Sequence, residues 1–318
     1  MKITIVAFDL WGFNKKIADY LIQKDIEVTF LDTNSIKYIY KSKMERVGNF
    51  LNKVFLGKNI KKDYLNRTLI KMINELPKQD YVLMVNPGLF RKDILALLRA
   101  KTNQLIAYNY DSLARIPLPE NHDTLFNKIF SFDINDVKKH SYLSLLTNYI
   151  YLDKHINTIP KNKAFMILSK SHEREIILSK IADILDANNL NYEFIVANPA
   201  TKKVNKKIHL TEQHIKLDTV IEKMKEAEIL IDLVRQNQTG LSFRIFEAMA
   251  LHKKIITNNT TIKDYDFYNE NNILVIDNEN ITIPETFLNS EYQPLSEELY
   301  QKYTLDNFTK TVFQKINH

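Results

Sequence analysis

The stretch from Ile229 to Asn258 constrains the fold of this chain more than any other. It reads as an apolar run, a polar loop, a glycine, an amphipathic helix and a second apolar run, which is the order of a strand, loop, helix and strand unit. In open α/β sheets, ligands bind beyond the carboxyl ends of such strands, and the N-terminus of the following helix offers N–H groups to an anion. Thr239, Gly240 and Ser242 stand at that helix start.

The predicted helix carries two kinds of side chain on neighbouring faces. Four apolar residues have the spacing of a core-facing stripe: Leu241, Ile245, Ala248 and Met249. Arg244 and Glu247 are three residues apart, so that their side chains can meet on the adjoining face. One basic and one acidic group would then emerge beside the glycine-led anion site, unless the two form only a solvated helix pair.

The segment from Gln238 to Ala250 resembles the donor-sugar motif of bacterial GT-B glycosyltransferases. The resemblance is to transferases that build capsule and lipopolysaccharide and to the spore-maturation type. In such families the Glu of an "EA" pair holds the ribose of a nucleotide-sugar donor, and the glycine-led helix start faces the diphosphate. The resemblance therefore implies a donor-binding set of Thr239, Gly240, Leu241, Ser242, Arg244 and Glu247, with Glu247 on the ribose and Arg244 on the phosphate charge.

The segment also departs from the better-known retaining pattern of this motif. That pattern has a further Glu about eight positions upstream of the Glu of the "EA" pair, and Thr239 stands in its place. The sugar-contacting role of that residue has no obvious carrier here, so the choice between retention and inversion stays open.

Composition excludes several classes of chemistry. The 318 residues contain no cysteine, which removes disulfides, thiolate zinc sites and cysteine nucleophiles. Only five glycines are present, without the glycine spacing of a dinucleotide fold or a Walker loop. The N-terminus lacks the features of a signal peptide, and no apolar run is long enough to span a bilayer. We expect a cytoplasmic protein, with peripheral contact to the inner face of the membrane as an option.

The N-terminal residues predict a first β-α-β unit, with strands at Lys2–Phe8 and Ile26–Leu31 around a helix at Gly12–Lys24. Asp9 lies in the loop between the first strand and the helix. In a GT-B protein this loop lines the acceptor side, which makes Asp9 a minor catalytic candidate. Capping of the helix by its carboxylate explains the residue equally well.

A second carboxylate follows the predicted strand Gln104–Tyr110. Asp111 comes directly after the strand's carboxyl end, where α/β enzymes place catalytic groups. The segment from Tyr108 to Ser112 also resembles the corresponding part of the capsule and lipopolysaccharide transferases. We predict Asp111 as the general base that takes the proton of an acceptor hydroxyl, with capping of a turn as the alternative.

The basic residues of the chain are concentrated between Lys41 and Lys71. Nine Lys and Arg against two acidic residues give this window a charge of +7, and the whole chain carries +6. Phe50, Leu51, Val54 and Phe55 are interleaved as in an amphipathic helix. This pattern fits either an anionic membrane surface or an anionic acceptor glycan. No helix-turn-helix, zinc or RNP pattern accompanies it, so the sequence predicts no nucleic-acid partner.

A second run of β-α-β pattern begins after a polar linker near residue 160. A strand ending at Leu168 is followed by Ser169 and Lys170, and Arg174 lies in the first turn of the next helix. In GT-B proteins the equivalent loop contacts donor phosphates, which implies that role for these three residues. The same resemblance places the nucleotide base against the segment 211–215, which begins at Thr211, and leaves the base itself unidentified.

These patterns predict an α/β protein with two Rossmann-like, doubly wound domains facing a cleft, the GT-B arrangement. The first domain would span 1–150 on the acceptor side, with a basic helical insertion at about 41–76. The second, at 160–300, would bind the nucleotide-sugar donor, and 301–318 would form a helix that could cross back.

The predicted activity is transfer of a sugar from a nucleotide sugar, with UDP- or another NDP-sugar as substrate and no separate cofactor. The acceptor would be a hydroxyl of a bacterial surface glycan, free or lipid-linked. We expect no metal, because no DxD pair sits in a strand-end loop. Two alternatives remain: a nucleotide-sugar epimerase of the same fold, and a non-catalytic scaffold in a glycan-assembly complex.

Overall fold

The computed structural model describes residues 1–154, 159–200, 205–213, 215–235 and 238–314. The chain divides into two compact units. Unit 1 comprises Met1–Phe132, Asp136–Leu146 and the described residues from Thr309 onward, whereas unit 2 comprises Asp133–Asn135 and Thr147–Phe308. Each unit contains a six-stranded sheet in which every pair of neighbouring strands is parallel.

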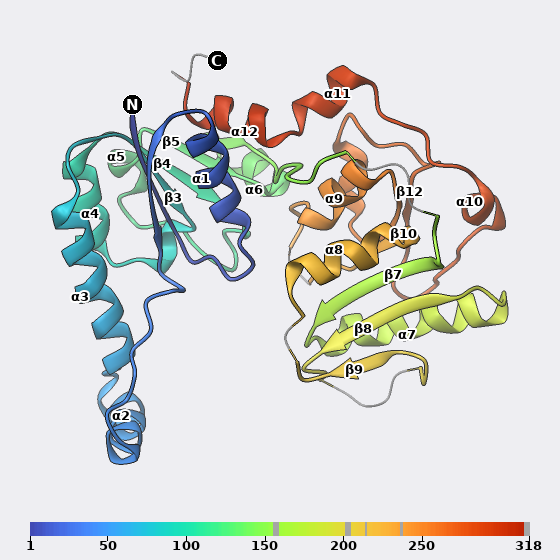
Figure 1. Ribbon diagram of the computed structural model, residues 1–318, viewed down its shortest axis with the longest axis horizontal. Helices are drawn as coiled ribbons and strands as arrows, with labels where there is room; N and C mark the ends of the chain where they lie inside the picture. The colour runs from blue at the N-terminus through green and yellow to red at the C-terminus, as the bar shows by residue number, and fades with distance from the viewer. Residues whose placement is uncertain (155–158, 201–204, 214, 236–237, 315–318) are drawn as a thin grey trace. The chain divides into compact units, whose positions relative to one another are not determined.

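The sheet of unit 1 has the strand order β2-β1-β3-β4-β5-β6 (Figure 1). Its strands are β1 (Lys2–Ala7), β2 (Glu27–Asp32), β3 (Gln79–Val85), β4 (Thr102–Asn109), β5 (Lys128–Ser131) and β6 (Leu143–Leu145). The helices of this unit are α1 (Phe13–Gln23), α2 (Lys43–Leu56), α3 (Ile60–Glu75), η1 (Pro87–Leu89), α4 (Lys92–Lys101), α5 (His122–Leu125) and most of α6 (Ile134–Lys139).

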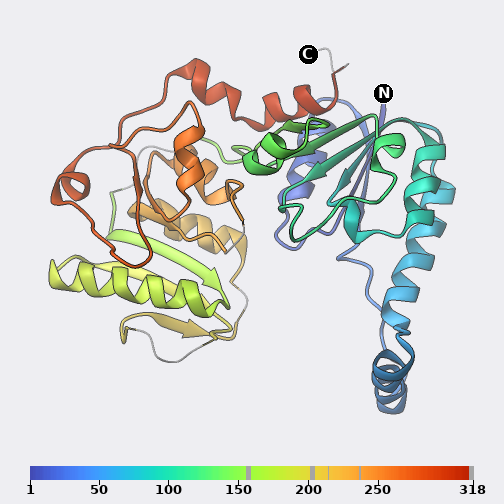
Figure 2. The same ribbon diagram turned by 180° about the vertical axis from the view of Figure 1, so that it is seen from behind.

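Both faces of this sheet are covered, because side chains of a strand alternate between the two faces. Val82 and Met84 of β3 belong to an apolar cluster with α3 and α4. Tyr81 points to the other face, where its ring lies 5.6 Å from that of Phe313, just beyond α12. In Figure 2 the long helix α3 extends past the edge of the sheet, and α2, which precedes it in the chain, lies at its far end.

The sheet of unit 2 has the strand order β12-β11-β10-β7-β8-β9. Its strands are β7 (Asn162–Ser169), β8 (Tyr192–Ala197), β9 (His209–Thr211), β10 (Ala227–Asp232), β11 (Lys254–Thr257) and β12 (Ile273–Val275). Its helices are α7 (His172–Ala187), α8 (Leu217–Lys225), α9 (Phe243–Leu251), η2 (Thr260–Asp264), α10 (Glu285–Asn289), α11 (Glu297–Lys302) and α12 (Leu305–Val312), which ends in unit 1.

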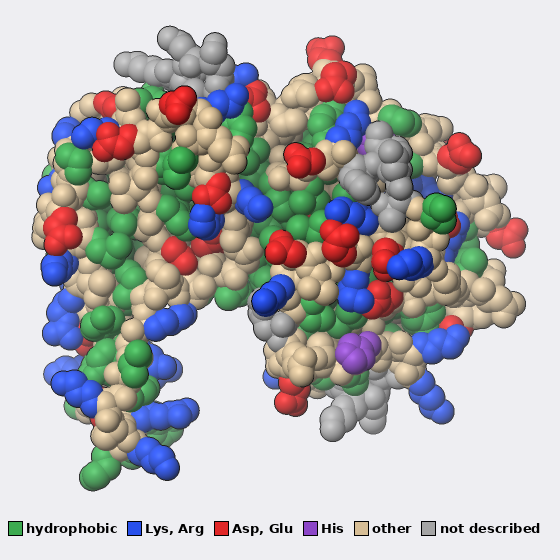
Figure 3. All heavy atoms as spheres, viewed as in Figure 1, with side chains coloured by type: hydrophobic (Ala, Val, Ile, Leu, Met, Phe, Trp, Pro, Cys, Tyr) green, Lys and Arg blue, Asp and Glu red, His purple; other side chains and the backbone are tan. Residues whose placement is uncertain are grey.

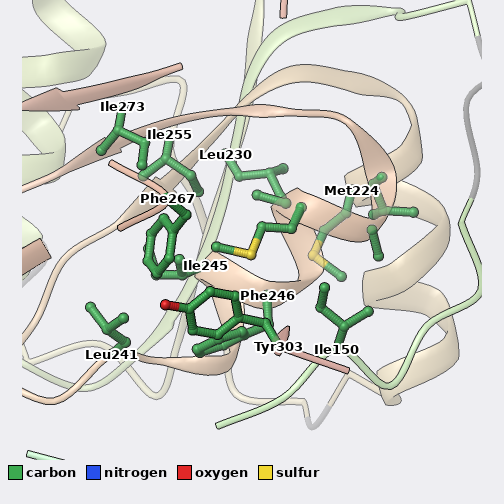
Figure 4. Packing of buried hydrophobic residues seen from close by; sticks show 14 of the residues in the cluster. Ile150, Met224, Leu230, Leu241, Ile245, Phe246, Ile255, Phe267, Ile273 and Tyr303 are labelled. Carbon is green, nitrogen blue, oxygen red and sulfur yellow. The ribbon is translucent and has the colours of Figure 1, made fainter. Parts of the chain in front are cut away.

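Two apolar clusters sandwich the sheet of unit 2. One joins the sheet to α8 and α9 and includes Ile245 of α9, Leu230 of β10 and Ile255 of β11, while Phe246 of α9 lies beside Tyr303 (Figure 4). The other joins the opposite face to α7 and α10. The predicted stripe Leu241, Ile245, Ala248 and Met249 is buried, as expected. The core therefore holds α9 rigidly across the strands whose carboxyl ends flank its N-terminus.

The doubly wound α/β architecture predicted from the sequence is confirmed, with two differences in detail. The basic insertion forms two helices, α2 and α3, separated by Gly57, which adopts a left-handed conformation with φ of 64°. The short edge strand β6 was not predicted, since three residues give too little alternation to stand out. The acceptor and donor roles of the two domains stay predictions.

We predict that Lys254 makes stability pH-dependent in the alkaline range. Its buried ammonium donates to the carbonyls of Phe287 and Ser290, and burial together with the charge of Lys163 lowers its pKa to about 8. Between pH 8 and the unfolded pKa near 10.4, the unfolded chain binds more protons, so the contribution of Lys254 to stability rises with pH. The free energy of unfolding in urea, measured for wild type and Lys254→Met at pH 7.5 and pH 10, should favour wild type more at pH 10 than at pH 7.5. An equal difference between the two proteins at both pH values would contradict this.

Candidate functional site

The start of α9 is fixed by a buried carboxylate at the end of β10. Ser242 caps the helix, its Oγ accepting from the N–H of Arg244 at 3.1 Å and donating to Oδ1 of Asp232 at 2.7 Å. Thr257, at the end of β11, donates to the other oxygen of Asp232 at 3.3 Å. Burial raises the pKa of Asp232, while these hydroxyls and the charges of Arg244 and Arg174 oppose the rise. The helix start is thereby tied to two strand ends.

The loop before α9 is anchored through its carbonyl groups. Thr261 and Asn259 donate to the carbonyl of Thr239 at 2.7 and 3.1 Å, and Asn148 donates to that of Leu241 at 2.8 Å. The hydroxyl and N–H of Thr239 both donate to Asp133. Within the described residues, no acceptor bonds the N–H groups of positions 240–242. The loop thus holds its acceptors against the protein.

Arg244 and Glu247 form a buried ion pair. Their charged atoms are 3.1 Å apart, and the side chains are only 14% and 4% exposed, so they are not a solvated surface pair. The hydroxyl of Tyr151 donates to the second oxygen of Glu247. Burial and the negative charge of Glu247 raise the pKa of Tyr151, which therefore stays a donor. An ionised carboxylate has about four lone-pair sites, so Glu247 can accept further hydrogen bonds.

Two guanidinium groups lie at the carboxyl ends of β7 and β10. Arg174 donates to the carbonyls of Ser169 and Leu233, and Arg235 donates to the Ser169 hydroxyl at 3.4 Å. The Nε of Arg174 is buried without a hydrogen-bond partner. Burial and the charge of Arg235 lower the pKa of Arg174 to about 10. In the described part of the chain, neither group has a carboxylate oxygen within 4 Å, so this guanidinium pair carries positive charge that an anion would neutralise.

The remaining residues predicted to bind the nucleotide-sugar donor lie along the same edge of the sheet. Lys170 is exposed just after β7. Thr211 ends β9, in register with Ala197 of β8 and, through it, with Ser169 of β7. At the usual strand spacing, Thr211 is about 10 Å from Ser169. Residue 214 of the predicted base-binding segment lies outside the described residues.

Asp9 in unit 1 is engaged in local structure. Its two carboxylate oxygens accept from the N–H of Gly12 at 3.0 Å and of Lys15 at 2.8 Å, which stabilises the start of α1. Burial raises the pKa of Asp9 overall, although these N–H groups act in the opposite direction. This geometry matches the capping explanation of Asp9, and a catalytic role remains a prediction.

Asp111 lies just beyond β4 in unit 1, where its Oδ1 is 2.8 Å from Nη1 of Arg115. The neighbouring Tyr110 connects it electrostatically to Asp9, because burial and the charges of both carboxylates raise the pKa of Tyr110 to about 12. Both predicted catalytic carboxylates of unit 1 thus lie at the carboxyl edge of one sheet. Exposed apolar side chains accompany them there, namely Phe8, Leu10, Trp11 and Leu89.

Sequence reasoning missed the residues that support the predicted donor-binding side chains. Asp232, Asp133, Tyr151 and Arg235 all contact a predicted donor-binding residue. The one local signal was Asp232, an acidic residue within the apolar run 229–234. The others are far from their partners in sequence, and only the fold brings them together.

Two further features are absent from the residues that the structure describes. No group of three or more His, Cys, Asp or Glu side chains there is arranged to hold a metal ion. None of the helices in that part of the chain combines the length and apolar character that a bilayer span needs.

The fold is similar to that of several solved glucosyltransferases. An α-glucosyltransferase bound to UDP and a 13-mer DNA with an HMU base has a TM-score of 0.57 at 11% identity, covering 99% of this chain and 98% of the other. The complex of an α-glucosyltransferase with UDP-glucose and abasic DNA gives 0.55 at 12%, covering 99% and 94%. A DNA-modifying β-glucosyltransferase studied with and without UDP-glucose gives 0.50 at 16%, covering 99% and 96%. No protein-family model and no curated protein matches the sequence.

These comparisons establish the fold and correct one prediction. The chain has the GT-B fold, with two Rossmann-like domains. The prediction that excluded nucleic acid as a partner is wrong, because glucosyltransferases of this fold are bound to DNA in two of these structures. The absence of helix-turn-helix, zinc and RNP patterns therefore excludes nothing for this fold. None of the three structures concerns a surface glycan, and that acceptor stays a prediction.

Removal of the Ser242 hydroxyl should destabilise unit 2 more than loss of an ordinary helix cap. Ser242→Ala loses the cap, typically worth about 1 kcal/mol, and also takes one donor from the buried Asp232 carboxylate, a further 1–3 kcal/mol. Ser296→Ala is the matched control, since Ser296 caps α11 on the exposed surface. Urea unfolding should rank Ser242→Ala clearly below Ser296→Ala in stability; equal losses would show that the bond to Asp232 is not stabilising.

Proposed function

We propose that this protein is a glycosyltransferase that moves a sugar from a nucleotide-sugar donor, with UDP-sugars as the first candidates, to an acceptor hydroxyl. The observation that carries the proposal is the guanidinium pair beside the N-terminus of α9. Arg174 and Arg235 lie at the ends of β7 and β10, and the N–H groups of 240–242 belong to the loop after β10. A diphosphate is the type of group that both features would bind.

Glu247 is proposed to bind the ribose of the donor. Arg244 and Tyr151 orient its carboxylate from two sides, and each oxygen keeps acceptor capacity for a ribose hydroxyl. Because the carboxylate is already buried and held, ribose binding would not require ordering of a flexible side chain. Ser169, Lys170 and Thr211 are proposed to extend the donor site along the sheet edge.

The proposed reaction breaks the bond between the anomeric carbon and the diphosphate oxygen and forms a glycosidic bond to the acceptor oxygen. The electron pair of the broken bond leaves with the diphosphate, whose charge the guanidinium pair and α9 would stabilise. The acceptor proton would pass to Asp111 as general base. We further propose that no divalent metal is required, which activity in the presence of EDTA would test.

The acceptor has two candidates. The sequence resemblance to capsule and lipopolysaccharide transferases favours a hydroxyl of a bacterial surface glycan. The similarity in fold to glucosyltransferases bound to DNA favours a hydroxymethylated base in DNA as the second candidate. Incubation with a radiolabelled donor and either hydroxymethylated duplex DNA or a surface-glycan extract would identify the acceptor class by which polymer takes up label.

Arg235→Gln and Glu247→Gln should weaken donor binding at different parts of the nucleotide. Loss of a charged hydrogen bond costs about 1.5–3 kcal/mol, a factor of roughly 10 to 100 in Kd. Binding is measured by calorimetry with the nucleoside diphosphate that binds best among a panel, and with the corresponding nucleoside. Arg235→Gln should weaken binding of the diphosphate but not of the nucleoside, whereas Glu247→Gln should weaken binding of both. Arg91→Gln is the control, since Arg91 pairs with Asp93 on the surface of unit 1. Unchanged diphosphate affinity in Arg235→Gln would remove the donor-site assignment.

Asp111→Asn should lower kcat by two to four orders of magnitude while leaving donor Kd unchanged, because a base acts only on the acceptor. Asp9→Asn is the comparison: its carboxylate holds the start of α1, so we expect lower stability and a smaller loss of kcat. Near wild-type turnover in Asp111→Asn would reject it as the base.

Two other results would indicate the alternative functions. Conversion of the nucleotide sugar to its epimer in the absence of an acceptor would indicate an epimerase, and nucleotide binding without any turnover would indicate a scaffold.

A further inference from the structure

Helix α2 is amphipathic but is packed the opposite way from an ordinary surface helix. Ser42 caps its N-terminus by accepting from the N–H of Glu45, and Gly57 ends it in a left-handed conformation. The helix is therefore well defined at both ends, and its 14 residues make it about 21 Å long. None of its residues is buried.

The polar face of α2 is the face bound to the rest of unit 1. Glu45 accepts from the hydroxyl of Tyr38 at 2.5 Å and from the N–H of Lys41 at 2.6 Å. Asn49 donates to the hydroxyl of Tyr40 and accepts from the N–H of Ile60, both at 2.8 Å. These bonds fix the rotation of the helix about its axis.

The apolar face consequently points away from unit 1. It is formed by Met44, Val47, Phe50, Leu51, Val54 and Phe55, which are between 47% and 85% exposed. At 100° per residue these side chains cover an arc of about 140°, the width of a face that an ordinary helix buries in a core. Figure 3 shows hydrophobic side chains on this projecting segment, next to Lys and Arg side chains.

Positive charge surrounds this apolar face. The segment 41–71, here called the basic arm, contains nine Lys and Arg and two acidic residues, and nine minus two gives +7. Lys43, Lys53 and Lys58 are exposed on or beside α2. The arm therefore offers a large apolar area and cationic charge within one short helix.

We propose that the basic arm binds an anionic lipid membrane, with α2 lying in the plane of the interface. The apolar face would enter the boundary between head groups and acyl chains, while the Lys and Arg side chains meet anionic head groups. Each basic residue near such a surface contributes roughly fivefold in affinity, through about 1 kcal/mol of attraction.

The charge and the apolar face together favour a membrane over other partners. A second copy of this chain would cover the apolar face but bring a second charge of +7 beside the first. DNA or an acidic polysaccharide would neutralise the charge but leave the apolar side chains in water. Only an anionic membrane supplies both an apolar phase and negative charge at one surface.

Flotation of the full chain with vesicles tests this proposal directly. Vesicles of phosphatidylcholine with 30% phosphatidylglycerol should carry the protein, and pure phosphatidylcholine vesicles should carry at least tenfold less. Phe50→Ser/Phe55→Ser should reduce binding to the anionic vesicles at least tenfold, whereas Ile22→Ser, an exposed apolar position on α1, should not. Lys43→Gln/Lys53→Gln/Lys58→Gln should also reduce it, whereas the matched triple Lys139→Gln/Lys206→Gln/Lys263→Gln should have a much smaller effect.

Several results would overturn the proposal. One is a lack of binding to anionic vesicles, and another is vesicle binding that Phe50→Ser/Phe55→Ser leaves unchanged. A dimer in light scattering that Phe50→Ser/Phe55→Ser converts to monomer would identify a second copy as the occupant. If duplex DNA or dextran sulfate binds more strongly than vesicles, and Phe50→Ser/Phe55→Ser does not change that binding, the partner of the arm is a polyanion. Since α2 has no buried residue, the serine variant should keep the wild-type Tm without vesicles; a large drop would mean that the apolar face is already buried.

Discussion

The carboxylate of Asp232 is the centre on which the loop and helix start at the carboxyl edge of the unit 2 sheet depend. It lies buried where β10 ends and receives hydroxyl groups from the cap of α9 and from the end of β11. A buried charge is tolerated only when it is hydrogen-bonded and near compensating charge. Arg244 and Arg174 supply that charge, so the carboxylate that orders the start of α9 also interacts electrostatically with one member of the guanidinium pair, Arg174, and with the partner of Glu247, Arg244.

Much of the architecture was predictable because parallel sheets leave a strong trace in sequence. Strands buried on both faces read as continuous apolar runs, and the helices between them show a stripe such as Leu241, Ile245, Ala248 and Met249. The pairing of Arg244 with Glu247 followed from their spacing of three residues. Features of this kind are local, and local periodicity can be recognised in a single sequence without homologous sequences for comparison.

The parts that could not be predicted depend on contacts between distant residues. Tyr151 reaches Glu247 across 96 positions, and Asp133 reaches Thr239 across 106. Nothing in the neighbourhood of either residue distinguishes it from a surface Tyr or a capping Asp. The orientation of α2 was equally hidden, since periodicity shows that a helix has an apolar face but not which face the protein keeps.

The uneven distribution of charge affects how the whole protein behaves on columns and in binding assays. The basic arm carries +7 and the entire chain +6, so everything outside residues 41–71 sums to 6 − 7, a charge of −1. The isoelectric point of about 9.0 is thus a property of a short segment rather than of the two α/β units. Retention on a cation exchanger or on heparin will report the state of that arm, and a protease that trims it would leave a nearly neutral, faintly acidic pair of α/β units.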